Sequence, residues 1–89
     1  MPRYVVEHEY REPLTDEMHN EEARRADPCL AKYGVTWKAT YLAADRMKAV
    51  CDFEAETAEQ IMTALRSADV PFARVWQATR YGKPNSPPP

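Results

Sequence analysis

The chain has few of the residues and motifs from which many functions are recognised. Its 89 residues include only two glycines and two cysteines. There is no glycine-rich phosphate loop and no Gly-x-Ser-x-Gly nucleophile motif. The compact metal-binding spacings Cys-x-x-Cys, His-x-x-x-His and His-Glu-x-x-His are also missing. These absences argue against nucleotide-binding and serine-hydrolase chemistry, and they mean that any metal site is assembled from separate elements.

Long apolar runs and an excess of one charge are missing too. No apolar segment approaches the ~18 residues that a membrane span needs, so we expect no membrane partner. The N-terminus lacks a charged segment followed by an apolar run, which predicts a cytoplasmic protein with reduced thiols. The net charge is −2, with both signs mixed along the chain, so nothing indicates a nucleic-acid partner.

The length predicts a single domain over residues 1–82. Residues 83–89 are rich in proline, which lacks an amide donor, so we expect a disordered tail there. A domain of this size buries only about 60% of the surface that its unfolded chain exposes. Dimerisation, metal binding or disulfides commonly stabilise such domains.

Hydrophobic periodicity predicts the order βαββαβ. Strands are expected over 3–10, 35–41, 47–54 and 73–81, and helices over 15–33 and 57–68. This order is typical of an α+β ferredoxin-like sandwich, in which two helices cover one face of a four-stranded antiparallel sheet.

Local signals fix the helix ends. Thr15 is placed to cap the first helix, and Thr57 with Gln60 forms a capping box for the second. Gly34 is placed to end the first helix. Pro28 is expected to kink that helix or to restart it with Asp27 as a new cap.

The predicted strands carry more aromatic residues than one buried face needs. They are Tyr4, Tyr10, Trp37, Tyr41, Phe53 and Trp76. A large apolar surface exposed to water would promote association. We therefore expect the face of the sheet that the helices leave uncovered to pack against a second copy in a homodimer. A small-molecule pocket on that face, lined by Trp37, Tyr41 and Trp76, is an alternative that can coexist with the dimer.

Several short segments resemble a family of small bacterial domains of unknown function, one branch of which is described as nickel-binding. They are Pro2–Glu7, Leu14-Thr15, Val35-x-Trp37, Tyr41, Asp45, Lys48, Cys51, Glu54-Ala55 and Val70-Pro71. The similarity covers residues 2–79. It implies a dimeric ferredoxin-like fold and nickel binding. His8 and the pair Asp27-Pro28 depart from the family pattern.

Nickel and similar divalent transition metals prefer imidazole, thiolate and carboxylate ligands. Strands one and three of this fold are neighbours, so His8 and Cys51 are the first candidate pair if they share a face. For Cys51 alone, the favoured interpretation is a small core residue, since free cysteine is among the most buried residue types. Glu7, His19 and Glu22 are further candidates; for Glu22 we also expect a surface ion pair with Arg25.

The sequence indicates no catalytic residues, and it favours a binding protein over an enzyme. We therefore predict a homodimer that binds a transition metal, nickel in particular, and serves in metal buffering or sensing. The alternative is a small-molecule-binding or monooxygenase-like dimer whose pocket is lined by His8, Trp37, Tyr41 and Trp76, which rests on analogy of fold alone.

Overall fold

The computed structural model describes residues 1–82. The expected tail, 83–89, lies outside the described residues. The elements follow the order βαββαβ: β1 Arg3–Glu9, α1 Asp16–Lys32, β2 Thr36–Leu42, β3 Lys48–Glu54, α2 Ala58–Ser67 and β4 Arg74–Ala78. The four strands form one antiparallel sheet in the order β2-β3-β1-β4.

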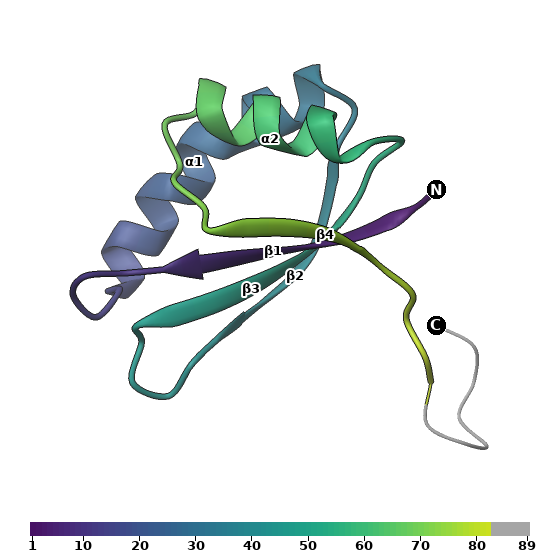
Figure 1. Cartoon of the computed structure of the whole chain (residues 1–89). Coiled ribbons are helices and arrows are strands. Elements are labelled where there is room, and N and C mark those ends of the chain that lie inside the picture. Colours follow the sequence, from purple (N-terminus) through teal and green to yellow (C-terminus); the bar gives the residue numbers. More distant parts are fainter. Residues whose placement is uncertain (83–89) are drawn as a thin grey trace.

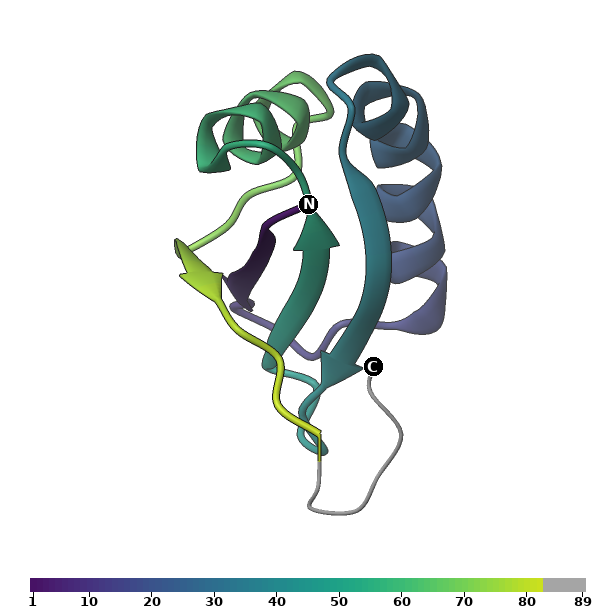
Figure 2. The ribbon, with the colours of Figure 1, turned by 90° about the vertical axis from the view of Figure 1, so that its right-hand side faces the viewer.

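Both helices lie on the same face of the sheet, so the predicted ferredoxin-like sandwich is confirmed (Figures 1 and 2). Helix α1 lies beside β2 and α2 lies towards β4. We call the covered side of the sheet the helix face and the other side the open face. None of the helices in residues 1–82 is long and apolar enough to cross a membrane.

Strand β1 is central because it pairs with both β3 and β4. Its side chains alternate: Tyr4, Val6 and His8 are buried on the helix face, whereas Val5 and Glu7 point to the open face. This period of two follows from the pleat of an extended chain. The helix-face residues pack against Leu30 and against Ile61, Leu65 and other apolar residues of α2.

The helix ends follow the predicted signals. The Thr15 side chain accepts a hydrogen bond from the backbone N–H of Met18, and Thr57 and Gln60 form the reciprocal capping box. Gly34 follows α1 with φ of +71°, a conformation that favours glycine. Helix α1 continues through Pro28, so a restart at Asp27 was the wrong alternative.

Strand β2 departs from the predicted alternation. Its pairing with β3 shifts between Trp37 and Ala39, which is a β-bulge. A bulge adds one residue to a strand and thereby changes which face the following side chains point to. As a result Trp37 and Thr40 share the helix face, where their side chains are joined by a hydrogen bond.

The open face is therefore less aromatic than predicted. Tyr4 and Phe53 are core residues beneath the helices, and Tyr10 and Trp37 also lie on the helix side. The large exposed side chains on the open face are Tyr41, Val50 and Trp76.

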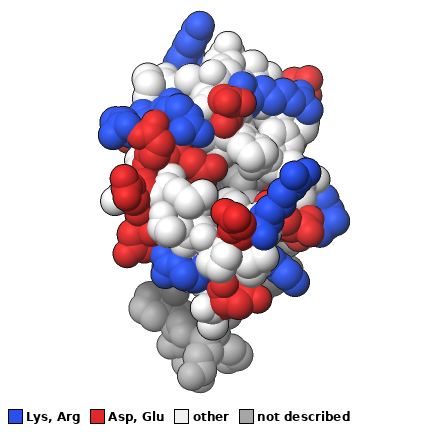
Figure 3. Space-filling view, turned by 90° about the vertical axis from the view of Figure 1, so that its left-hand side faces the viewer, with Lys and Arg blue, Asp and Glu red and all other residues white. Residues whose placement is uncertain are grey.

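Ion pairs between arginine and carboxylate side chains lie among the exposed apolar residues of the open face. Arg3 binds Asp52 and Glu54, and Arg74 binds Glu7. Mixed charge also marks the side of the molecule drawn in Figure 3, where acidic and basic side chains lie around an uncharged central area. No single-sign patch forms on that side to attract a polyanion.

Candidate functional site

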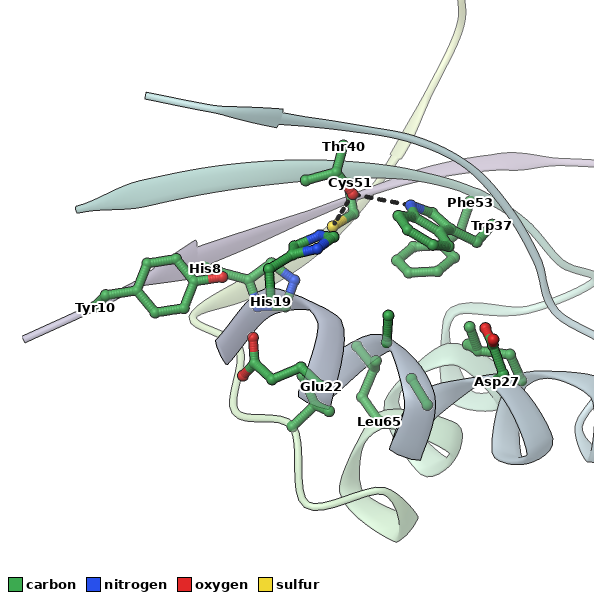
Figure 4. Close-up of a pocket in the computed structure, with 14 residues that line it drawn as sticks. His8, Tyr10, His19, Glu22, Asp27, Trp37, Thr40, Cys51, Phe53 and Leu65 are labelled. Atoms are coloured by element: carbon green, nitrogen blue, oxygen red, sulfur yellow. Dashed lines mark hydrogen bonds between the residues drawn. The ribbon is translucent and has the colours of Figure 1, made fainter. Parts of the chain in front are cut away.

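A cavity of about 50 Å³ lies between α1 and the helix face of the sheet (Figure 4). Its floor comes from β1 with the following Tyr10, from β2 and from β3. Its roof comes from α1 between His19 and Leu30, together with Leu65 of α2 and Val70. Most of the wall is apolar, but seven polar or titratable side chains border the cavity. They are His8, Tyr10, His19, Glu22, Asp27, Thr40 and Cys51.

The pairing of β1 with β3 brings His8 and Cys51 together. His8 is opposite Ala49, and Cys51 is opposite Val6, so the two candidate ligands are one diagonal step apart on the same face. Side chains in this relation lie within reach of each other across an antiparallel pair. The predicted placement of His8 and Cys51 on a common face is therefore what the structure shows.

His8 is 5% exposed, and the structure defines which of its nitrogens carries the proton. Its Nδ1 lies 2.9 Å from the carbonyl oxygen of Pro71. A carbonyl can only accept a hydrogen bond, so in the neutral ring Nδ1 bears the hydrogen and Nε2 keeps its lone pair. Nε2 makes no hydrogen bond among the described residues, and it is not sealed from solvent, because no buried side-chain nitrogen or oxygen in residues 1–82 lacks a partner. This is the arrangement of a histidine metal ligand, whose second nitrogen is commonly held by a backbone carbonyl.

The thiol of Cys51 is held by a short chain of hydrogen bonds. The indole Nε1 of Trp37 donates to Thr40 Oγ1 at 2.9 Å, and Thr40 Oγ1 lies 3.1 Å from Cys51 Sγ. Because Thr40 accepts from the indole, its own O–H is free to donate to the sulfur. Figure 4 shows both contacts as dashed lines. The bulge in β2 makes this chain possible, because it places Trp37 and Thr40 on one face.

Helix α1 contributes His19 and Glu22 to the cavity. His19 is half-buried, and its ring lies 6.0 Å from that of Trp37. The expected ion pair of Glu22 with Arg25 is wrong: Arg25 binds Glu21 and the carbonyl oxygens of Ala68 and Asp69. Among the described residues Glu22 has no ion pair, and it lines the cavity half-buried.

Two titratable groups of the cavity wall have raised pKa values. Burial raises the pKa of Tyr10 to about 12, and the charges of Glu22 and Cys51 add to the shift. Burial also raises the pKa of the Cys51 thiol, with Glu22 adding and the Thr40 hydrogen bond opposing. Both shifts arise mainly because burial disfavours the charged form, so they show that this part of the cavity wall is poorly solvated.

The other predicted site residues lie on the open face, away from the cavity. Glu7 accepts hydrogen bonds from Arg74 and from Trp76 Nε1 at 2.7 Å, and these bonds lower its pKa. Tyr41 is also exposed on the open face. The structure therefore brings together His8, His19, Glu22, Cys51 and Trp37, and it places Glu7, Tyr41 and Trp76 on the opposite side.

Three groups that contribute to the candidate site were not identified from the sequence. Tyr10 was assigned to an aromatic face, Thr40 was not considered, and the Pro71 carbonyl has no side-chain signal. The register of β1 against β3 could have placed Tyr10 beside His8, since both follow the same alternation.

The donor set fits nickel by its chemistry, because imidazole nitrogen, thiolate sulfur and carboxylate oxygen are all ligands for borderline divalent metals. The distances between the candidate ligands do not fit a metal site as well as their chemistry does. Within residues 1–82 no three His, Cys, Asp or Glu side chains are close enough to hold a metal ion as they stand. The candidate ligands are divided between the sheet and α1.

Comparison with known proteins gives two positive findings. The model of a family described as nickel-responsive, SCO4226-like proteins matches residues 4–77. The crystal structure of SCO4226 from Streptomyces coelicolor A3(2) matches with a TM-score of 0.81 and 10% sequence identity, covering 90% of this chain and 99% of that chain. At this identity the structural match shows the fold. No curated protein sequence matches the chain significantly.

Proposed function

Because the chain belongs to the family of nickel-responsive, SCO4226-like proteins, we propose that it binds nickel or a similar divalent transition metal and serves in metal buffering or sensing. The observation that supports this proposal most strongly is the buried imidazole of His8. Its Nδ1 is bound to the Pro71 carbonyl, its Nε2 makes no hydrogen bond within residues 1–82, and Cys51 lines the same cavity one diagonal step away on β3.

The proposed centre is the cavity between α1 and the sheet. His8 and Cys51 are its ligands from the sheet, and His19 and Glu22 are its ligands from the helix. Glu7 lies on the other side of the sheet and is engaged by Arg74 and Trp76, so we assign it to the open face.

Size favours an ion over an organic substrate. An engineered protein cavity that binds benzene measures about 150 Å³, whereas this one measures about 50 Å³. Of the aromatic residues predicted to line an enzyme pocket, Trp37 borders this cavity together with His8. Tyr41 and Trp76 line a separate depression of about 590 Å³ on the open face, which is the surface we assign to the dimer. The cavity beneath α1 is therefore too small for an aromatic substrate, and the larger depression lacks His8 and Trp37.

We further propose that the protein acts as a homodimer through the open face. Tyr41 is 67% exposed and Trp76 is 47% exposed there, with Val50 between the two strands that carry them. Burying such residues against a second copy would remove apolar surface from water. Two-fold pairing of this kind is the commonest oligomeric arrangement.

The metal proposal is tested by calorimetric titration of nickel into protein that was purified without a histidine tag. His8→Asn retains an amide N–H for the Pro71 carbonyl but lacks the ring nitrogen that would bind metal. We expect it to weaken nickel binding at least about tenfold. Glu7→Gln, which changes the neighbouring residue on the open face, is the matched control and should bind as the wild type does.

Equal nickel affinity in His8→Asn and the wild type would contradict the assignment of the site. Failure of the wild-type protein to bind nickel at micromolar concentration would contradict the function itself. The dimer is tested separately by sedimentation velocity of Tyr41→Ala/Trp76→Ala, which should sediment as a monomer at concentrations where the wild type is dimeric.

A further inference from the structure

The depression on the open face, which measures about 590 Å³, is bordered by two exposed aromatic side chains. Tyr41 on β2 is 67% exposed, and Trp76 on β4 is 47% exposed. Three residues with short side chains border the depression with them: Val5, Ala39 and Ala78. We call this feature the open-face depression. Domains that recognise proline-rich segments present aromatic-lined grooves of this kind to their ligands.

The strand register explains why these residues share one face. Val5 on β1 lies opposite Trp76 on β4, and Val50 on β3 lies opposite Tyr41 on β2. Opposite residues of an antiparallel pair point to the same side of the sheet. The bulge in β2 brings Ala39 to this side as well, because the residues after it alternate in a shifted register. The open-face depression therefore extends from one outer strand of the sheet to the other.

The indole ring of Trp76 is held in place although it is half exposed. Its Nε1 donates a hydrogen bond to the Glu7 carboxylate at 2.7 Å, and Arg74 binds the same carboxylate. A side chain that is already fixed loses little conformational entropy when it binds a partner. Trp76 is therefore a suitable anchor for a ligand that lies across the sheet.

The chain leaves the fold beside the open-face depression. Strand β4 ends at Ala78, and the next two residues, Thr79 and Arg80, border the depression together with Trp76. In Figure 1 the chain beyond β4 turns away from the helices and runs to the side of the open face. Residues 83–89 are therefore attached to the fold next to the depression.

Residues 83–89 have the composition that such a depression suits. Their sequence is Lys-Pro-Asn-Ser-Pro-Pro-Pro, so four of the seven residues are proline. Proline-rich segments favour the polyproline II helix and bind aromatic grooves at a low cost in entropy. Seven residues of such a helix span about 22 Å. The two outer strands of a four-stranded sheet are about 14 Å apart, so this length is sufficient to reach from Trp76 to Tyr41.

We propose that residues 83–89 bind the open-face depression of their own chain, across Trp76 and Tyr41, and thereby compete with a second copy for the open face. This inference rests on the proposed homodimer, whose interface includes the same two aromatic residues. Attachment to the fold gives the segment an effective concentration on the order of millimolar. Weak binding is therefore enough to cover the open face in dilute protein, and the segment sets the concentration at which the dimer forms.

Nuclear Overhauser contacts in the labelled chain test the binding directly. In dilute protein we expect contacts from the proline rings of residues 84–89 to the aromatic rings of Tyr41 and Trp76. A mixture of labelled and unlabelled chains shows whether each contact lies within one chain. Absence of these contacts would overturn the proposal, and contacts found only between two chains would place the segment on a partner copy instead.

A variant of the segment tests the competition. Replacement of all four prolines by serine keeps the length and the charge but removes the rings: Pro84→Ser/Pro87→Ser/Pro88→Ser/Pro89→Ser. None of these residues belongs to a strand or helix of the described fold. A face that is covered for most of the time raises the apparent dissociation constant, so the variant should lower that of the dimer about fivefold or more. Sedimentation velocity over a dilution series measures it.

The matched control is Asn85→Ala/Ser86→Ala, which changes the same segment but keeps every proline, and it should dimerise as the wild type does. An equal or weaker dimer in the proline variant would overturn the competition and leave the proposed homodimer standing. A chain that stays monomeric both with and without the prolines would overturn the homodimer and the competition together.

Discussion

The two faces of the sheet differ in how their polar groups are satisfied. On the open face the charged groups neutralise one another: Arg3 binds two carboxylates, and Glu7 accepts from Arg74 and Trp76. On the helix face, beneath α1, Glu22 has no ion pair and His8 keeps one ring nitrogen without a partner among the described residues. No buried side-chain nitrogen or oxygen within residues 1–82 lacks a hydrogen-bond partner, so these two groups border the cavity without being sealed from solvent and can accept a ligand there.

The comparison also shows where stability and function are located. Apolar residues on the helix face pack against α2 and the second half of α1, and they form the core. The cavity adjoins this core on the same face: core residues such as Leu30, Phe53 and Leu65 form its apolar wall, and His19 and Glu22 border it from the first half of α1. The predictions below test this contrast, beginning with the largest effect.

The largest difference is expected between matched truncations in β3. Phe53 is 3% exposed on the helix face, and Val50 is 39% exposed on the open face. Phe53→Ala should lower the free energy of unfolding by about 3–5 kcal/mol, because it leaves a hole in the core. Val50→Ala should lower it by about 0.5 kcal/mol. Urea unfolding measures both, and similar losses in the two variants would contradict the assignment of the core to the helix face.

Nickel should stabilise the protein through one cysteine and not the other. At about 100 times the dissociation constant, nickel should raise the free energy of unfolding by about 2.7 kcal/mol. Cys51→Ala should lose most of this gain, whereas Cys29→Ala, which alters the half-buried thiol of α1 outside the cavity, should retain it. Thermal unfolding with and without nickel measures the difference. Equal gains in the two variants would remove Cys51 from the site.

A smaller contrast concerns the helix caps. Thr57 belongs to a full capping box, whereas Thr15 accepts a single hydrogen bond from Met18. Each threonine-to-alanine change should lower the free energy of unfolding by about 1 kcal/mol. Because the first half of α1 is poorly packed, Thr15→Ala should also speed amide exchange in residues 17–24 while leaving α2 unchanged. Faster exchange in α2 instead would contradict the local character of the cap.

The two faces should lose stability at opposite ends of the pH range in metal-free protein. The pKa of Glu7 lies below its ordinary value of 4.5 in the folded state, so its contribution is present above that pH and is lost as the pH falls further. Tyr10 has a folded pKa of about 12 against an ordinary 10.0, so stability should fall as the pH rises from 10 to 12.

Glu7→Gln should remove part of the acid-side loss, and Tyr10→Phe should remove part of the alkaline loss. Denaturant unfolding at a series of pH values compares each variant with the wild type. The pH assignment fails if Tyr10→Phe alters the acid side, or if Glu7→Gln alters the alkaline side.

The fold could be predicted because its signals are local. The alternation in β1, the capping threonines and Gly34 each act over a few residues, and all of them favour the same architecture. The proximity of His8 and Cys51 also followed, since it depends only on the neighbour relation of two strands and on a shared face.

The features that the sequence did not reveal depend on tertiary contacts. The bulge at Trp37 depends on how β2 is paired with β3, and it reverses the face assigned to Trp37. Arg25 reaches the carbonyls of a loop more than forty residues away, so a helical spacing rule assigned it the wrong partner. The tautomer of His8 depends on the Pro71 carbonyl, a backbone group that carries no sequence signal.

The most direct measurement is the nickel K-edge X-ray absorption spectrum of the loaded Cys29→Ala protein, in which Cys51 is the remaining cysteine. The proposed centre predicts sulfur and imidazole nitrogen together in the first coordination shell, and loss of the sulfur contribution when Cys51 is also replaced by alanine. A shell of oxygen and nitrogen alone in the Cys29→Ala protein would show that Cys51 is not a ligand and would contradict the proposed centre.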